Sequence, residues 1–343
     1  MQSIGLKHFN DPPITFNEDP AINEEISHRY IYVAPKSSGV EPGGIYRKIS
    51  KAFKKTRRLH FIKLNYRTPV FGDYVMRNFE NIRGPRVLRN IPVISYFARC
   101  IILIASIEKR EEINRRAVIE ALGNDLYRAL GVRTQKLQLI RAEYHNGKEK
   151  FLLDGAEARG ENFEAFHTFR GQIHKGALPN GKVKVGEHSY SVNQKELARV
   201  GVAALLLSDW DKVGSEGDNL GFYISEEDQQ AHIMNIDTGQ SLSSGMSLRD
   251  ITPNLLRDKK FSSQLDLLSN QFANFSIFSA TEEEDRLEAF SDIVNHYSRI
   301  NTVFKEYSEA MSEHPKIQKN IQSLEEAFHQ RLTNTLATVA QNR

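Results

Sequence analysis

Four side chains with oxygen ligands lie close together in the sequence, just after a strongly apolar segment. Asp209, Asp211 and Asn219 follow that segment, and Asp237 comes shortly afterwards, two residues before a glycine. Carboxylate and amide oxygens are the ligands that Mg²⁺ prefers in proteins, and a carboxylate can orient or deprotonate an attacking hydroxyl group. These residue types are therefore suited to binding a metal–nucleotide complex and transferring a phosphoryl group.

The expected elements around these residues favour a site over an ordinary surface turn. Residues 194–207 have the apolar pattern of a buried helix, and residues 220–224 and 232–236 have the pattern of two short strands. A loop rich in Asp and Gly is, by itself, usually only a turn. Here the acidic loop lies between a buried helix and a hairpin, and the last Asp follows the hairpin, so the motif has a structural context.

These residues resemble motifs of the protein-kinase superfamily, and the resemblance spans about residues 29–242. Asp211 and Asn219 resemble the catalytic-loop Asp and its Mg²⁺-binding Asn, while Asp237 and Gly239 resemble the ends of the Asp-Phe-Gly motif. The resemblance implies that Asn219 and Asp237 bind Mg²⁺ and that Asp211 positions the acceptor hydroxyl group.

The identity of the catalytic acid stays open between Asp209 and Asp211. Asn219 follows Asp211 by eight residues. This spacing is longer than in most kinases, and residues 214–217 look like a loop insertion that accounts for it. The pair Asp211-Lys212 resembles the Asp-Arg pair of phosphatidylinositol kinases and HipA-like kinases, which favours Asp211.

The same resemblance implies a nucleotide-binding set in the N-terminal half. Kinases place a glycine-bearing hairpin and a lysine of the third strand at the phosphates, and a glutamate of the next helix holds that lysine. The candidates for these three roles, in that order, are Gly43 and Gly44, Lys63, and Glu120. Glu111 and Glu112 compete with Glu120, and most strand lysines and helix glutamates are simply exposed.

The order of expected elements predicts an α+β protein with a two-lobed, protein-kinase-like fold. A helix over residues 108–130 ends just before Gly131, and two strands, 136–144 and 149–158, are joined by an Asn-Gly turn. The mainly helical region from about residue 255 has breaks near 279–280 and 314–315. The predicted divisions are an N-terminal arm over 1–28, an N-lobe over 29–158 with an insertion at about 65–106, and a C-lobe over 159–343.

Composition predicts a soluble, cytosolic protein. Of the 343 residues, 40% are hydrophobic and 26% are charged, and the single cysteine, Cys100, excludes an internal disulfide. The N-terminus lacks the pattern of a signal peptide. The most apolar run, residues 91–107, is shorter than the roughly 20 residues of a membrane span and contains Arg99. The net charge of +3 does not indicate a nucleic-acid partner.

A basic stretch over residues 47–58 holds seven cations and no acid. Its apolar spacing is compatible with a helix, and the cations would then form either a solvated face or an anion site. An anion site would accept an inositol polyphosphate, a phosphoinositide headgroup or an acidic membrane surface. The candidate ligands are Lys51, Lys54, Lys55 and Arg58.

The function that the resemblance implies is a kinase that uses ATP and Mg²⁺, acts on a protein or phosphoinositide and is regulated by an anion at the basic stretch. Secreted bacterial effector kinases of the Legionella type have similarly eroded motifs, which implies an effector acting in a host cytosol. The alternatives are a kinase-like binding module with little catalysis, which would recognise phosphoinositides or a host protein, and a nucleotidyl transferase on the same fold.

Overall fold

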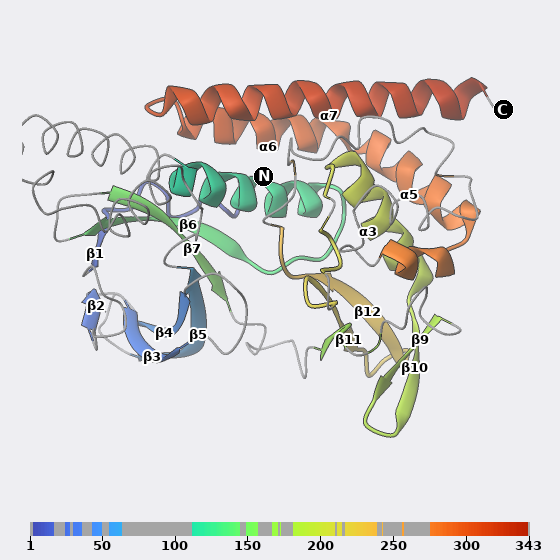
Figure 1. Ribbon diagram of the computed structural model, residues 1–343, viewed down its shortest axis with the longest axis horizontal. Coiled ribbons are helices and arrows are strands. Elements are labelled where there is room, and N and C mark those ends of the chain that lie inside the picture. Colours follow the sequence, from blue (N-terminus) through green and yellow to red (C-terminus); the bar gives the residue numbers. More distant parts are fainter. Residues whose placement is uncertain are drawn as a thin grey trace, which may run out of the picture.

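The structure of this chain is a computed structural model, drawn in Figure 1. It describes residues 3–16, 25–27, 30–35, 43–49, 55–63, 112–144, 149–156, 167–170, 172, 181–209, 211–214, 217–238, 242, 256 and 275–341. The described chain forms two sheets and a set of helices, so the predicted α+β class is confirmed.

The first sheet has seven strands in the order β1-β6-β7-β5-β4-β3-β2. The strands are β1 (Ile14–Phe16), β2 (Glu25–Ser27), β3 (Tyr30–Pro35), β4 (Gly43–Ile49), β5 (Lys55–Lys63), β6 (Leu137–Tyr144) and β7 (Glu149–Ala156). Neighbouring strands are antiparallel, except that β1 runs parallel to β6. The predicted strands at 136–144 and 149–158 are present as β6 and β7, and the Asn-Gly turn between them lies outside the described residues.

The second sheet has five strands in the order β8-β11-β12-β10-β9. They are β8 (His167–Thr168), β9 (Lys182–Val185), β10 (His188–Val192), β11 (Leu220–Ile224) and β12 (Gln230–Asn235). The sequence predicted only the β11–β12 hairpin. It also held a signal for β9 and β10, because residues 182–185 alternate Lys and Val, and Gly186 with φ 61° starts the two-residue turn.

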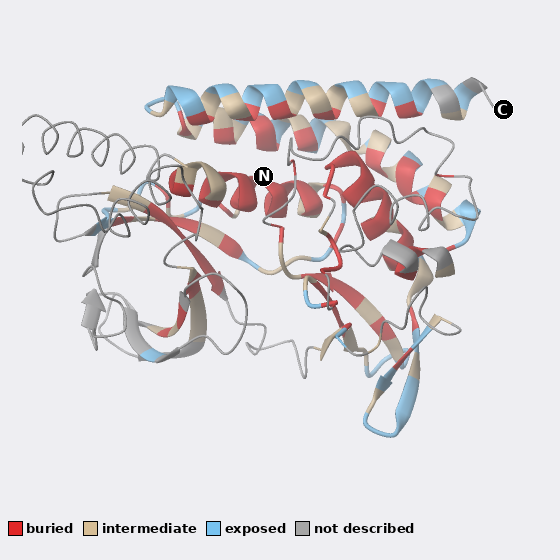
Figure 2. Ribbon diagram, in the orientation of Figure 1, coloured by how far each residue is buried: buried red, intermediate tan, exposed pale blue. Residues whose placement is uncertain are grey.

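The helices lie mainly on one side of the two sheets, above them in the view of Figure 1, and carry much of the buried core (Figure 2). They are a helix over residues 112–129, drawn in teal in Figure 1, then α3 (Gln194–Leu206), the 3₁₀ segment η5 (Phe275–Ala280), α5 (Glu283–Asn295), α6 (Tyr297–Ala310) and α7 (Pro315–Gln341). The helix over 112–129 and α3 are the most buried, while α7 is exposed along its outer face. The breaks predicted near 279–280 and 314–315 are present. A third break, at His296 between α5 and α6, was not predicted.

The N-terminal segment is more closely packed than the arm that the sequence suggests. The amide of Gly5 donates to Asp125 (N···O 2.7 Å), and the ring of Phe9 is buried against Phe151 (centroids 5.2 Å apart). Strand β1 then adds to the edge of β6. Residues 3–16 therefore contribute to the core and to the first sheet.

The described parts of the basic stretch, residues 47–49 and 55–58, are strands and not the helix that the apolar spacing suggests. Residues up to Ile49 belong to β4 and residues from Lys55 belong to β5, which pairs antiparallel with β4. The strand pairing is favoured because Tyr46 and Ile62 are buried in the sheet and Ile45 is partly buried there. A helix would remove these side chains from the sheet. Of the predicted anion ligands, Lys55 and Arg58 lie on β5, and Lys51 and Lys54 lie outside the described residues.

Some predictions fall on parts of the chain that the structure does not describe. They are the insertion at 65–106, the apolar run at 91–107 with Cys100, and the boundary near residue 159. Within the described residues, no helix is long and apolar enough to cross a membrane.

Candidate active site

Helix α3 ends in a turn that sends the chain directly into the acidic loop. The amide of Ser208 donates to the carbonyl of Leu205 (3.2 Å), and the amide of Asp209 donates to the carbonyl of Ala204 (2.9 Å). This pair of bonds is a Schellman motif, with Ser208 in the left-handed region at φ 53°. Such a conformation costs a non-glycine residue about 1 kcal/mol or more. The buried helix end therefore fixes where Asp209 lies.

Asp209 is enclosed by protein. Its carboxylate accepts hydrogen bonds from the hydroxyl of Tyr127 (2.8 Å) and the ammonium group of Lys212 (3.0 Å). The side chain of Asp209 is 1% exposed and that of Lys212 is 0% exposed. Asp211 is only partly buried. The geometry therefore favours Asp211 over Asp209 as the acid that a substrate can reach.

Two left-handed glycines fold the loop after Asp211 back on itself. Gly214 has φ 81° and Gly217 has φ 78°, and the amide of Gly217 donates to the carbonyl of Gly214 (3.2 Å). This turn returns Asn219 to the start of the loop, where its side-chain amide donates to the carbonyl of Asp211 (2.6 Å). The eight-residue spacing between Asp211 and Asn219 is thus absorbed by a turn, and the two residues remain in contact.

Gly214→Ala is expected to destabilise the protein by about 1–2 kcal/mol, because the left-handed backbone is unfavourable for a residue with a Cβ. A Cβ there would also lie 3.2 Å from Cγ of Asn219 and 2.6 Å from Oδ1 of Asp218. We expect Asn219 to shift and Mg²⁺-dependent nucleotide binding, measured by calorimetry, to weaken. The matched control is Gly186→Ala, which carries similar strain (φ 61°) with nothing within 4 Å. Equal nucleotide affinity in both variants would contradict this account of Asn219.

Asp211 lies among other carboxylates. Burial is the main cause that raises its pKa, and the negative charges of Asp209 and Asp237 add to it, so the pKa of Asp211 rises to about 7. The hydrogen bond from Asn219 and the charge of Lys212 act in the opposite direction. Carboxylates that raise one another's pKa are stabilised by a cation placed between them.

The segment that carries Asp237 is hydrogen-bonded to two parts of the acidic loop, Asn219 and Lys212. The amides of Ile236 and Asp237 both donate to the carbonyl of Asn219 (3.1 and 3.2 Å). The carbonyl of Asp237 accepts a hydrogen bond from Lys212 (2.7 Å). The backbone of Asp237 is therefore bonded to both ends of the loop that contains Asp211.

The same segment is also bonded to the helix over residues 112–129 and to the chain that follows it. The hydroxyl of Thr238 donates to the carbonyl of Glu120 (2.8 Å), and the amide of Asn235 donates to the carbonyl of Arg133 (2.8 Å). Gln135 donates its side-chain amide to the carbonyl of Ile236. The Asp237 segment therefore joins the second sheet to the helix that carries Glu120.

Lys63 connects the first sheet to this arrangement. Its ammonium group donates to the carboxylate of Glu120, which is 1% exposed, and lies 3.7 Å from the carboxylate of Asp237. The competing acid Glu112 instead binds Arg115 and Arg116, and Glu111 lies outside the described residues. The structure thus brings together Lys63, Glu120 and Asp237 from three separate elements.

The two glycines of β4 lie beside the lysine. In the register of the sheet, Gly43 is opposite Lys63 and Gly44 is opposite Ile62. The start of β4 is therefore adjacent to the end of β5. The hairpin residues 36–42 lie outside the described part of the chain.

The donor set fits a magnesium ion bound together with a nucleotide. Asn219 and Asp237 are the side chains that would hold it, because their backbones are in contact: Asn219 directly precedes β11, and Asp237 follows β12. Mg²⁺ commonly takes one or two protein ligands and completes its coordination with phosphates and waters. Within the described residues, no group of three His, Cys, Asp or Glu side chains is arranged to hold a metal ion.

The sequence did not indicate the residues that hold these groups in place. These residues donate hydrogen bonds to main-chain carbonyls or to a buried carboxylate; they are Tyr127, Lys212, Gln135 and Thr238. Such contacts require no particular residue type and leave no pattern in a single sequence. One signal in the sequence could have identified Lys212. It follows a strongly apolar segment, and a lysine that is buried needs an acidic partner.

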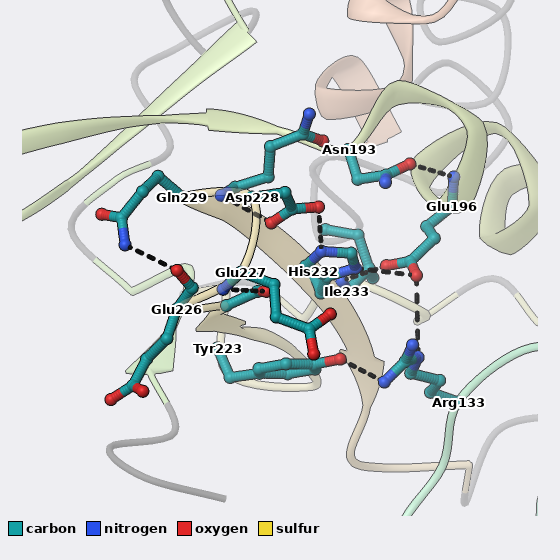
Figure 3. Close-up of polar contacts among 12 residues, drawn as sticks. Arg133, Asn193, Glu196, Tyr223, Glu226, Glu227, Asp228, Gln229, His232 and Ile233 are labelled. Carbon is teal, nitrogen blue, oxygen red and sulfur yellow. Dashed lines mark hydrogen bonds and ion pairs between the residues drawn. The ribbon is translucent and has the colours of Figure 1, made fainter.

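A second polar network joins β11, β12 and α3 (Figure 3). The ring of His232 binds Glu196 of α3 and Asp228 of the β11–β12 turn, at 3.0 Å each, and stacks on Tyr223. Arg133 binds the hydroxyl of Tyr223 and lies 3.6 Å from Glu196. Arg133, whose carbonyl accepts a hydrogen bond from the amide of Asn235, is therefore also linked to α3 through Glu196 and to β11 through Tyr223.

His232 should make stability depend on pH. Burial alone would lower its pKa, but the hydrogen bonds to Glu196 and Asp228 outweigh burial and raise it. Its stabilising contribution is therefore complete below the unfolded pKa of about 6.5 and is lost as pH rises through the higher folded pKa. We expect the Tm advantage of the native protein over His232→Gln to narrow by about 2 °C between pH 5.5 and 9. An advantage that stayed constant over this range would contradict the assignment.

Comparisons with known proteins give little further information. No protein-family model and no curated protein sequence matches the chain. Among solved structures, a proinflammatory kinase of Helicobacter pylori, CtkA, is similar with a TM-score of 0.44 and 13% sequence identity, over 95% of this chain and 99% of that chain. The argument for function therefore rests on the geometry of the site.

Proposed function

We propose that this protein is a phosphotransferase that uses ATP and Mg²⁺. The observation that carries the proposal is the meeting of three elements at Lys63, whose ammonium group contacts both Glu120 and the carboxylate of Asp237. A cation held between two acids from different elements is suited to binding phosphate oxygens next to a metal ligand. The resemblance to kinase motifs implies the same pairing.

In this proposal, Lys63 binds the α and β phosphates of ATP, and Glu120 orients it. Asn219 and Asp237 hold Mg²⁺, which would neutralise phosphate charge during transfer. Gly43 and Gly44 lie beside Lys63, where the absence of side chains lets the backbone approach the phosphates.

Asp211 is the group that we assign to the acceptor. Its carboxylate would accept a hydrogen bond from the attacking hydroxyl group and would thereby direct the oxygen of that hydroxyl group towards the phosphorus. Asp209 is assigned a structural role, because Tyr127 and Lys212 already occupy its carboxylate.

We infer that the acceptor is a hydroxyl group of a protein or of a phosphoinositide. The basic stretch supports an anionic ligand on the first sheet, since Lys55 and Arg58 lie on β5, the strand that ends at Lys63. An inositol polyphosphate or an acidic membrane bound there would act on the position of that lysine. Replacing the four candidate ligands by Gln tests this idea, because it should weaken anion binding or activity; they are Lys51, Lys54, Lys55 and Arg58.

The proposal is tested by incubating the protein with labelled ATP, with and without Mg²⁺, and with a generic protein acceptor or phosphoinositide vesicles. Parallel reactions contain inositol hexakisphosphate. Transfer of the γ-phosphoryl group that needs Mg²⁺ supports the proposal. Transfer of a nucleotidyl group, seen from the product mass, would replace it with the nucleotidyl-transfer alternative. Nucleotide binding without any transfer would indicate a kinase-like binding module.

A further inference from the structure

Lys212 is the most deeply buried charged side chain in the described part of the chain. Although it follows Asp211 directly, its side chain is 0% exposed, so it cannot reach a phosphate in this arrangement. Its ammonium group lies 3.0 Å from the carboxylate of Asp209, 2.7 Å from the carbonyl of Asp237 and 4.4 Å from the ring centre of Tyr127. Burying a charge is costly unless its partners are fixed, so this placement needs a reason.

We propose that Lys212 is a positioning residue, whose ammonium group fixes the main chain of Asp237 relative to Asp211. The catalytic part of this inference rests on the proposed function, and the positional part does not. Lys212 would act through the backbone of the metal ligand and would touch neither substrate nor nucleotide.

The argument begins with the two backbone groups of Asp237. Its amide donates to the carbonyl of Asn219 (3.2 Å), and its carbonyl accepts from Lys212 (2.7 Å). With both groups bonded, the direction of the Asp237 carboxylate depends only on its side-chain torsions. That carboxylate is left pointing towards Lys63, at 3.7 Å.

Asp209, the other hydrogen-bond partner of Lys212, is also held by several contacts. The carboxylate of Asp209 is bonded to Lys212 and to the hydroxyl of Tyr127, and the amide of Asp209 closes the end of α3 by donating to Ala204. Tyr127 belongs to the helix that also carries Glu120. Lys212 therefore ties Asp237 to two buried helices, α3 and the helix over residues 112–129.

A single replacement of Lys212 would not separate positioning from folding. Lys212→Met would leave the buried carboxylate of Asp209 without its cation, and an unpaired buried charge is strongly destabilising. The double variant Lys212→Met/Asp209→Asn removes both charges together. The Asn side chain keeps an oxygen that can accept the hydroxyl of Tyr127, so the neutral pair restores most of the packing without restoring the bond to Asp237.

The test compares native protein, the double variant and a matched surface control, Lys195→Met. Lys195 lies in an exposed ion pair with Glu288, 69% and 60% exposed, which contributes little to stability. Hydrogen–deuterium exchange is measured at the amides of Ile236 and Asp237 without any ligand. Phosphoryl transfer and the Mg²⁺ concentration needed for half-maximal rate are measured in parallel.

We expect the double variant to recover much of the Tm lost by Lys212→Met. Exchange at Ile236 and Asp237 should nevertheless rise about ten-fold, the size expected for one lost hydrogen bond to a charged donor. Transfer should fall about a hundred-fold, because small displacements of positioned groups have effects of that size. The Mg²⁺ requirement should rise, whereas Lys195→Met should match the native protein in every measurement.

Native exchange rates at Ile236 and Asp237 in a folded double variant would overturn the inference. Recovery of native transfer and Mg²⁺ dependence in that variant would also overturn it, since it would show that Lys212 only balances the charge of Asp209. If the native protein shows no transfer with any acceptor, the proposed function fails, and the exchange measurement still decides whether Lys212 holds Asp237.

Discussion

Asp237→Ala is expected to lower phosphoryl transfer by about a thousand-fold or more and to leave the protein folded. The carboxylate would hold Mg²⁺ next to Lys63, and charge-stabilising groups in phosphoryl transfer contribute effects of this size. The fold should survive because the side chain is 40% exposed. The contacts that organise the segment come from the amide and carbonyl of Asp237, which alanine retains.

The control for this variant is Asp218→Ala, which removes an exposed carboxylate from the same region of the chain. Both variants lose one negative charge, so a general electrostatic effect would lower transfer equally in the two. We expect only Asp237→Ala to lose transfer, with Tm values within about 3 °C of the native protein for both. Substantial transfer by Asp237→Ala would contradict the assignment of the metal ligand.

Lys63→Met is expected to lower both activity and stability. Its removal leaves the carboxylate of Glu120, which is 1% exposed, without the cation that Lys63 supplies. Breaking a buried ion pair on one side costs about 3 kcal/mol. Transfer should fall about a hundred-fold or more because the phosphates lose a charged ligand. Urea unfolding measures the first effect, and transfer from labelled ATP measures the second.

Lys63→Met/Glu120→Gln distinguishes the two consequences of removing the lysine. The neutral pair should recover most of the free energy of unfolding, because no buried charge remains uncompensated. Transfer should stay low, because the phosphate ligand is still absent. If transfer recovered together with stability, Lys63 would have a structural role only.

The candidate site could be predicted where it depended on side-chain type and spacing. Asp211, Asn219 and Asp237 were identified because carboxylates and amides followed a buried helix and a hairpin in a particular order. Lys63 and Glu120 were identified only by resemblance to kinase motifs. The sequence could not show that they meet, because residues 64–111 separate the strand from the helix.

The choice between Asp209 and Asp211 could not be made from the sequence. It depends on how the chain leaves α3, and the left-handed residue there is Ser208, where a glycine would have signalled the turn. The partners of Asp209 add to the difficulty, since Tyr127 lies 82 residues away in the sequence. Burial of one acid and access to the other follow from tertiary contacts that no local pattern contains.

The fold was predicted best where hydrophobic periodicity was regular. The predicted bounds of strands β6, β7 and β11 and of helix α3 lie within two residues of the observed ones. The basic stretch was assigned a helical spacing because Ile45, Ile49 and Phe53 recur every four residues. Pairing with β5 determines the structure of its first part, and such long-range pairing overrides local spacing.

The central claim is that Asn219 and Asp237 hold one divalent ion together with a nucleotide beside Lys63. Titration calorimetry of ATP into the native protein and into Asp237→Ala, each with and without Mg²⁺, tests it most directly. The account predicts that Mg²⁺ strengthens ATP binding to the native protein and has little effect on the variant. ATP affinity that does not change with Mg²⁺ in the native protein, or changes equally in both proteins, would contradict it.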